Sequence, residues 1–499
     1  MAKQSFENTT YIFIPFSFEG NGLSGKGSSE EKSFRNLVNA VKKEDSSWRM
    51  VNDKVRYMLK FVADKIDSTN EETCQCFHFR LKKEVRPEYK LPDKDTWCTV
   101  CTDPHDDIKD EYKFRIRDID AFFFRTSVGI MSFRLSFDES EAGYGPKRIA
   151  AAQYYLKKSG RKDIHYPFGS ASEGGPAANI PNDPAANTPD SPAADNQNII
   201  SRKMLDIAKD LMRDYSNDFG FNFFYYANPT TERANVLTFI PVSGDQADNY
   251  LEDLFFLRRC YNGGYQFVRD EAQEAEEIYS ASADMKWGIS PEAAACLACP
   301  ERGRKKFIEE TFFNNFNTQY VFMYVLLLHQ KYVLYKFLTI IGNSDRNDLA
   351  TLENYRNQLY AFETDFVFSL VTEVPQYQNL YDRMVQAFAL RKMYEDVHEP
   401  ITSLAEVRRE ATEKAQQARD KSLNTALVML SLLSVFSALV DSFDFSREFL
   451  YDIFGIGAGG IRIMQWICIG LIFAIAIYVI RNFIKTRIAE KKLGIREKN

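Results

Sequence analysis

The stretch "LNTALVMLSLLSVFSALVD", Leu423–Asp441, decides how the C-terminal part of this chain is interpreted. It carries no charge before its last residue, which is typical of a buried or membrane-spanning helix. Asn424, Ser431 and Ser434 interrupt the leucines at spacings that place them on one side of a helix. The sequence therefore predicts a helix with an apolar surface and one polar line.

A second uncharged segment, 463–480, follows the first, 423–440, and each has about the minimum length for crossing a bilayer. Basic residues precede the first segment and follow the second, whereas acidic residues predominate between them. Because positive charge marks the cytoplasmic side, we expect cytoplasmic termini, an external loop at 441–462 and a basic tail at 481–499. The sequence thus predicts a multi-pass protein of the inner (plasma) membrane, surrounded by lipid bilayer.

The polar line continues back into the segment that precedes residue 423. Spacings of three and four residues keep its members on one slowly drifting helix face. The acidic stripe of the expected stalk is Glu406, Glu410, Glu413, Gln417 and Asp420, and the expected pore lining is Asn424, Leu427, Ser431, Ser434, Ala438 and Asp441. Around a symmetry axis such positions would form rings that favour cations, whereas a packing face or a solvated face is the alternative.

The part of the chain before the stalk has the composition of a folded α+β domain. Of the 499 residues, 45% are hydrophobic, which is enough for a sizeable core. Strand-like and helical patterns alternate in 1–168 and again in 199–302, and a Pro/Ala/Asn-rich linker with a repeated "PAAN" occupies 169–198. A helical region and stalk fill 303–422. The predicted fold class is an α+β cytoplasmic domain followed by a long helical stalk and two C-terminal transmembrane helices.

Proline positions divide the helical region. We expect a helix over 376–399 and a break or kink at Pro400. Beyond it, 401–440 lacks both Gly and Pro, which favours one continuous helix of about 60 Å at 1.5 Å per residue. The apolar run at 320–328 is too short for a span, so a buried helix is expected there.

The cysteines permit two interpretations. A tetrahedral zinc site could draw its ligands from Cys74, Cys76, His78, Cys98 and Cys101. Cys74, Cys76 and His78 also alternate along a strand-like segment, so reduced thiols on one face of a sheet are the favoured explanation.

A glycine-rich loop, "GNGLSGKGSS", follows a strand-like run and precedes a helical pattern. It matches seven positions of the phosphate-binding pattern GxxxxGK[ST], but Gly27 occupies the eighth and Ser28 comes one place late. A flexible loop is therefore one interpretation. The other is that Gly25, Lys26 and Gly27 bind an anionic ligand at a helix start.

Enzymatic and nucleic-acid functions find little support. The five histidines form no metalloprotease motif, and no nucleophile motif is present, so we expect no catalysis. The net charge of −6 comes from charges of both signs, which gives no basic field for direct nucleic-acid binding.

The layout resembles the CorA family of divalent-cation channels: a large α+β domain, a long stalk, two C-terminal apolar segments and a basic tail. The resemblance implies a homo-oligomer of five copies, a divalent cation as the transported ion, and Asn424 near the pore entrance. The family's Gly-Met-Asn signature is absent, and "VDSFDFSREFLYDIFGIGAGG" stands in its place. Asp441 and Asp444 are our candidates for acidic groups at the outer mouth.

Divergent proteins of this layout resemble the membrane effectors of type III CRISPR systems. That resemblance implies a ligand-sensing cytoplasmic domain, an adenine-nucleotide second messenger as activator and a role in antiviral defence. The alternative function is a non-conducting, membrane-anchored interaction or signalling protein.

Overall fold

The computed structural model describes residues 6–454, apart from 22–28, 53–54, 67, 107–108, 142, 169–197, 225–231, 245 and 344–348, together with scattered residues between 459 and 481. The chain divides into two units, Met1–Asp345 with Glu353–Ile401, and Arg346–Leu352 with Thr402–Asn499.

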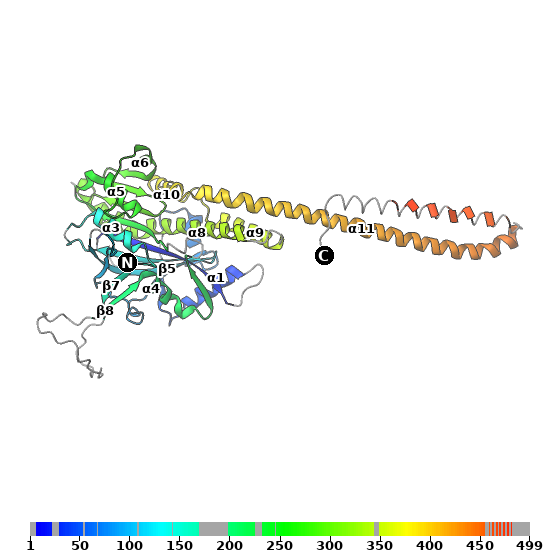
Figure 1. Cartoon of the computed structure of the whole chain (residues 1–499), viewed down its shortest axis with the longest axis horizontal. Coiled ribbons are helices and arrows are strands. Elements are labelled where there is room, and N and C mark those ends of the chain that lie inside the picture. The colour runs from blue at the N-terminus through cyan, green and yellow to red at the C-terminus, as the bar shows by residue number, and fades with distance from the viewer. Residues whose placement is uncertain are drawn as a thin grey trace, which may run out of the picture. The chain divides into compact units, whose positions relative to one another are not determined.

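The first unit is built on a mixed 13-stranded sheet (Figure 1). Its main strand order is β11-β12-β13-β10-β1-β6-β5-β4-β7-β8, while β3 joins β2 to β5 and β9 pairs with β1. The strands are β1 (Thr9–Gly20), β2 (Trp48–Met50), β3 (Cys76–Leu81), β4 (Cys98–Cys101), β5 (Glu111–Phe124), β6 (Val128–Phe137), β7 (Asp163–Pro167), β8 (Ile199–Lys203), β9 (Phe219–Phe223), β10 (Asn235–Pro241), β11 (Ile278–Ser282), β12 (Met285–Ile289) and β13 (Ala293–Ala298).

Helices connect and follow these strands. The α-helices are α1 (Ser29–Val41), α2 (Lys60–Ile66), α3 (Pro146–Leu156), α4 (Met204–Met212), α5 (Tyr250–Arg259), α6 (Glu271–Glu277), α7 (Phe313–Asn315), α8 (Val321–Asn343), α9 (Leu349–Phe366), α10 (Pro375–Ala387) and α11 (Leu390–Phe454). Short 3-10 helices are η1 (Arg213–Tyr215), η2 (Gln246–Asn249) and η3 (Pro300–Arg302), and π-helical turns are η4 (Phe307–Phe312) and η5 (Phe316–Tyr320).

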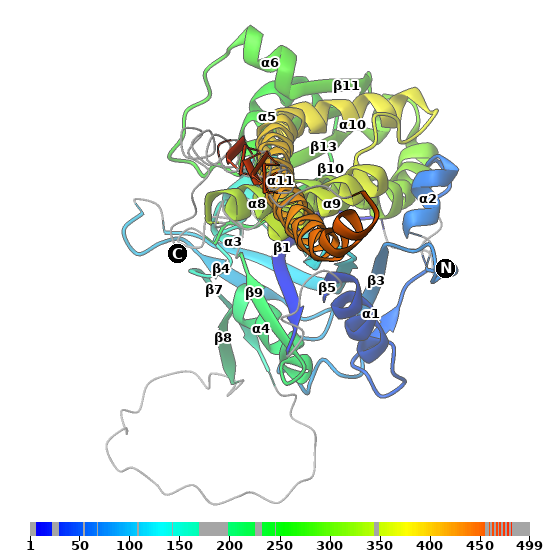
Figure 2. The same ribbon diagram turned by 90° about the vertical axis from the view of Figure 1, so that its right-hand side faces the viewer.

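Alternation along β1 shows how the sheet separates two cores. Ile12 and Ile14 belong to the core under α1, α3, α4 and α5. Tyr11 and Phe13 point to the other side, into the core formed with α8, α9 and α10. Figure 2 shows these last three helices grouped over β10 and β13. Both sheet faces are therefore covered, and this confirms the predicted α+β organisation.

The prediction of two C-terminal transmembrane helices is wrong. In the part of the chain that the structure describes, no helix is both long enough and apolar enough to cross a membrane. In α8, His329, Gln330 and Lys331 interrupt the apolar sequence. The predicted location as a multi-pass protein of the plasma membrane is corrected by the same finding.

Helix α11 differs from the expected segmentation at both ends. It begins at Leu390, contains Pro400 in its interior and continues to Phe454, beyond the expected loop boundary at residue 441. The remainder of that loop, the second apolar segment at 463–480 and the tail at 481–499 lie wholly or largely outside the described residues.

Candidate ligand-binding site

The helical break that Pro400 was expected to cause lies eleven residues earlier, at Ala389. Helix α10 ends at Ala387, and Ala389 adopts a left-handed conformation with φ of 53°. Helix α11 starts at the next residue. A left-handed backbone is unfavourable for a residue with a side chain, so this joint stores strain of about 1 kcal/mol.

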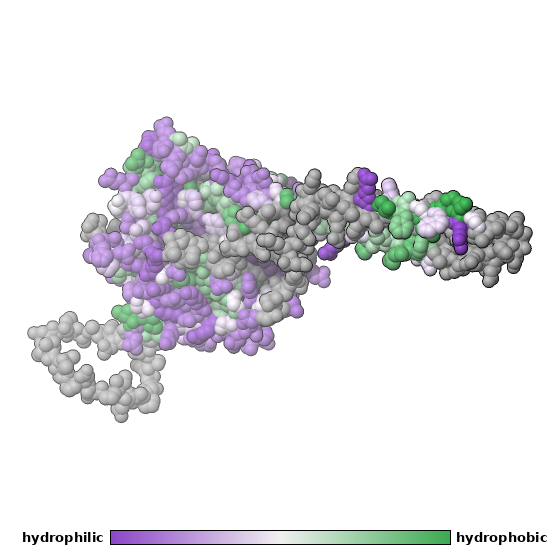
Figure 3. Space-filling model, turned by 45° about the vertical axis from the view of Figure 1, so that its right-hand side comes forward, coloured by the Kyte–Doolittle hydropathy of each residue, from purple (hydrophilic) through white to green (hydrophobic). Residues whose placement is uncertain are grey.

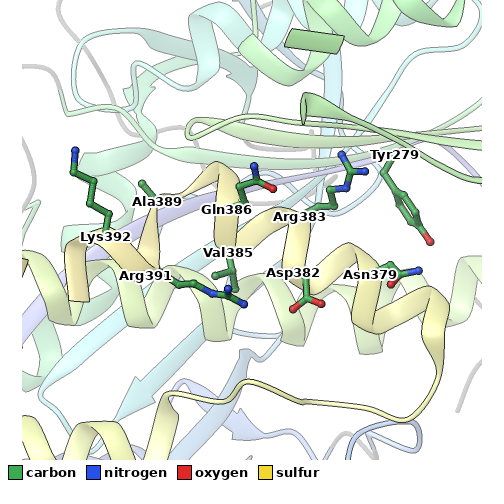
Figure 4. Close-up of a pocket in the computed structure, with 9 residues that line it drawn as sticks. All are labelled: Tyr279, Asn379, Asp382, Arg383, Val385, Gln386, Ala389, Arg391 and Lys392. Atoms are coloured by element: carbon green, nitrogen blue, oxygen red, sulfur yellow. The ribbon is translucent and has the colours of Figure 1, made fainter. Parts of the chain in front are cut away.

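A cavity of about 680 Å³ opens beside this joint (Figure 4). Tyr279 comes from β11, and the other side chains around the cavity come from α10, the joint and the first turn of α11. The lining residues are Tyr279, Asn379, Asp382, Arg383, Val385, Gln386, Ala389, Arg391 and Lys392. All of them belong to the first unit.

The charge of the cavity favours an anion. The lining includes three cationic side chains, those of Arg383, Arg391 and Lys392, and one carboxylate, that of Asp382. Within the described residues, Arg391 and Lys392 form no ion pair, and both side chains are exposed. These two cations are therefore available to a ligand, and guanidinium groups match phosphate geometry well.

Existing contacts hold part of the lining in place. Arg383 donates from Nη1 to the carbonyl oxygens of Ala275 (2.5 Å) and Glu276 (3.3 Å). Asp382 Oδ1 accepts a hydrogen bond of 3.0 Å from Gln378 Nε2. The cavity thus combines fixed groups on α10 with exposed cations on α11.

The wall behind the joint contains a buried lysine. Lys331 on α8 donates from Nζ to the carbonyl oxygen of Pro291 at 3.0 Å, and its ammonium lies 5.2 Å from the ring centroid of Phe388. Burial lowers the pKa of Lys331 to about 8. Phe388, which precedes Ala389, therefore packs against an ammonium group whose charged form is destabilised by burial.

The predicted stripe lies on one continuous helix, because α11 contains all of its members. The members of the stripe from Glu406 to Ser434 have exposed side chains. Glu410 and Glu413 pair within the helix with Lys414 (3.4 Å) and Arg409 (3.0 Å). These pairs reduce the negative field that the stripe was expected to present.

The serine hydroxyls in the stripe are also satisfied by their own helix. Ser431 donates to the carbonyl oxygen of Leu427 at 2.6 Å, and Ser434 donates to that of Leu430 at 3.0 Å. The side chains of Ala438, Asp441 and Asp444 lie outside the described residues. A pore lining and an acidic outer mouth therefore stay predictions.

The glycine-rich loop has the expected neighbours, since β1 ends at Gly20 and α1 begins at Ser29. Gly25, Lys26 and Gly27 themselves lie outside the described residues. β1 runs antiparallel to β6, β9 and β10, whereas a nucleotide-hydrolysing phosphate loop follows a strand of a parallel sheet. This topology differs from that of a nucleotide-hydrolysing phosphate loop, and anion binding by the glycine-rich loop stays a prediction.

The cysteines proposed for zinc are distributed along the sheet. Cys76 on β3 lies opposite Phe124, and Cys98 on β4 lies opposite Phe114. Those two positions are about ten residues apart on β5, or roughly 30 Å at 3.3 Å per residue. Cys74, Cys76 and Cys98 are buried and Cys101 is partly buried. Among the described residues, no three His, Cys, Asp or Glu side chains are grouped to hold a metal ion.

A buried ionic cluster on β3 and β5 accounts for His78 instead. Arg80 binds Asp120 through two hydrogen bonds of 2.6 and 3.1 Å, and His78 Nε2 lies 3.4 Å from the same carboxylate. Burial alone would raise the pKa of Asp120, but Arg80 and His78 outweigh it and hold that pKa well below its ordinary value. We interpret the cluster as structural, because its groups neutralise one another inside the sheet.

The cavity residues were not predicted from the sequence. Tyr279 is about 100 residues away from the other lining residues, which lie between 379 and 392, and no Gly or Pro marks the break at Ala389. The adjacent cations Arg391 and Lys392 were the available signal, but a continuous helix over 376–399 would have placed them on an ordinary solvated surface.

Comparison of the chain with family models, curated proteins and solved structures finds no match.

Proposed function

We propose that this chain is a ligand-responsive signalling protein, in which an anionic small molecule binds beside the α10–α11 joint and changes the conformation of that joint. The observation that carries the proposal is the position of the cationic cavity, whose lining includes Ala389 together with residues on both sides of it. A ligand that contacts both α10 and α11 binds with different affinity when their geometry changes, which is the requirement for a ligand-driven switch.

A nucleotide is the ligand class that fits this lining best. Arg391 and Lys392 suit phosphate oxygens, and Tyr279 offers a ring for stacking. Asn379 and Gln386 carry amides that donate and accept hydrogen bonds, as recognition of a base edge requires. This choice agrees with the adenine-nucleotide activator that the CorA-like resemblance implies.

Helix α11 is the proposed output element, and homo-oligomerisation is its proposed mode of action. Apolar side chains on its described C-terminal part are exposed, including Leu423 (63%), Leu430 (61%) and Leu433 (64%) (Figure 3). A helix surface of this kind is stabilised by packing against further helices. We propose that other copies of α11 cover it.

Cation conduction, an assembly of five copies and an antiviral role remain predictions of the resemblance. The continuity of α11 favours the first of these, because it places the acidic positions Glu406, Glu410 and Glu413 on one helix that an oligomer would bring together. Absence of catalysis also remains a prediction.

Calorimetric titration of the full chain with ATP tests the proposal. The change of both Arg391 and Lys392 to Ala should lower ATP affinity about tenfold or more, since charge-assisted hydrogen bonds contribute about 1.5–3 kcal/mol. The matched control changes Arg419 and Lys421, two exposed cations further along α11, to Ala. Equal affinities in the wild type and in the cavity variant would remove the ligand from this cavity.

A further inference from the structure

The first turns of α11 form a segment with its own attachments. Leu390, Val397 and Ile401 are buried in the core that includes α8 and α9. The boundary between the two units falls directly after Ile401. Pro400 removes a backbone donor at this boundary and weakens the helix there. Residues 390–401, the docking segment, therefore lie between two weak points, Ala389 and Pro400.

A hydrogen-bonded cluster fastens the docking segment to α9. Tyr394 donates its hydroxyl to Glu363 Oε1, and His398 Nδ1 lies 2.8 Å from the same oxygen. The Tyr394 hydroxyl also lies 2.8 Å from His398 Nδ1. Tyr394 and His398 are four residues apart on α11, so both reach one carboxylate from one helix face.

This cluster and the cavity use the same short piece of α11. Arg391 and Lys392 precede Tyr394 by less than one helical turn. Any rotation or shift of the docking segment relative to α9 consequently moves these two cations relative to Arg383 on α10. The cluster is partly shielded, with Glu363 24% and His398 37% exposed, which favours hydrogen bonds that water does not easily replace.

We propose that Glu363, Tyr394 and His398 form a clasp that regulates the cavity: it holds the docking segment where Arg391 and Lys392 complete the ligand site. The inference rests on the proposed function. When the clasp is closed, the binding-competent arrangement is populated. When it is open, apparent affinity falls in proportion to the population of that arrangement.

A double-mutant cycle on the full chain, with ATP and pyrophosphate as probes, tests the clasp. Glu363→Gln keeps the shape of the side chain but removes its charge, and Tyr394→Phe removes one hydroxyl. Each single variant should lower the affinity for the probes about fivefold. The double variant should bind no more weakly than the single variant of lower affinity, because the two substitutions break the same cluster. Glu395→Gln, an exposed neighbour of Tyr394, is the control and should match the wild type.

A second measurement separates the clasp from global folding. In both single variants, amide hydrogen exchange without ligand should accelerate in residues 390–401, while exchange in the sheet strands stays unchanged. Unchanged affinity, an additive loss of affinity, or acceleration throughout the sheet would each overturn the clasp.

The outcomes also distinguish this inference from the function on which it rests. If the wild type binds neither probe, or if the cavity variant at Arg391 and Lys392 binds them normally, the proposed function fails. If the wild type binds and the cavity variant does not, while both clasp variants bind like the wild type, only the clasp fails.

Discussion

Arg383 on α10 and Arg391 on α11 line the same cavity, although the left-handed turn at Ala389 separates their helices. The distance between these two cations therefore depends on the angle between α10 and α11 at the joint. An anion shared between them would stabilise one geometry over others.

The backbone at Ala389 gives a stability prediction. Ala389→Gly should stabilise the chain by about 1 kcal/mol, because glycine accepts a left-handed backbone without steric cost. Ala361→Gly, at an exposed site inside α9, should instead destabilise it by about 1 kcal/mol. Urea unfolding curves measure both changes. Two variants that shift stability in the same direction would contradict the strained joint.

Lys331 gives a pH prediction. Burial lowers its pKa to about 8 from an ordinary value of 10.5, so the folded chain holds this proton less tightly than the unfolded chain. The contribution of Lys331 to stability should therefore rise as the pH increases from about 8 to about 10.5. Relative to Lys331→Met, the wild type should gain on the order of 2 kcal/mol over this window. If the difference in unfolding free energy between the wild type and Lys331→Met stays constant across this pH window, the pKa of Lys331 is not lowered by folding.

The alternation of apolar residues predicted the strands and the α+β organisation, as the division of β1 between two cores illustrates. The absence of Gly and Pro from 401–440 predicted a continuous helix there, and α11 contains this whole segment. These features follow from local patterns that one sequence contains.

The joint and the cavity could not be predicted in the same way. Ala389 adopts an unfavourable backbone because tertiary packing of Phe388 and Leu390 fixes its neighbours, and both of those residues are buried. Pro400, by contrast, was expected to break or kink the helix, and α11 continues through it. The zinc hypothesis had a similar weakness, since the spacing of Cys76 and Cys98 in sequence says nothing of their separation along β5.

The apolar surface of α11 gives an assembly prediction. Changing Leu430 and Leu433 to Ser should shift the full chain towards smaller species, because each loses about 2 kcal/mol of apolar burial in an assembly. Sedimentation velocity measures the distribution of species. Changing Ala411 and Ala415 of the same helix to Ser is the control, with no shift expected. An unchanged distribution in the leucine variant would show that other copies do not cover these side chains.

The most direct test of the central claim is amide hydrogen exchange of the full chain across residues 386–401, with and without saturating ATP. We expect ATP to slow exchange at the α10–α11 joint in the wild type, and the variant with Arg391 and Lys392 changed to Ala to need at least tenfold more ATP for the same effect. Binding of ATP to the wild type with no change in exchange at the joint would contradict a ligand-driven switch at Ala389.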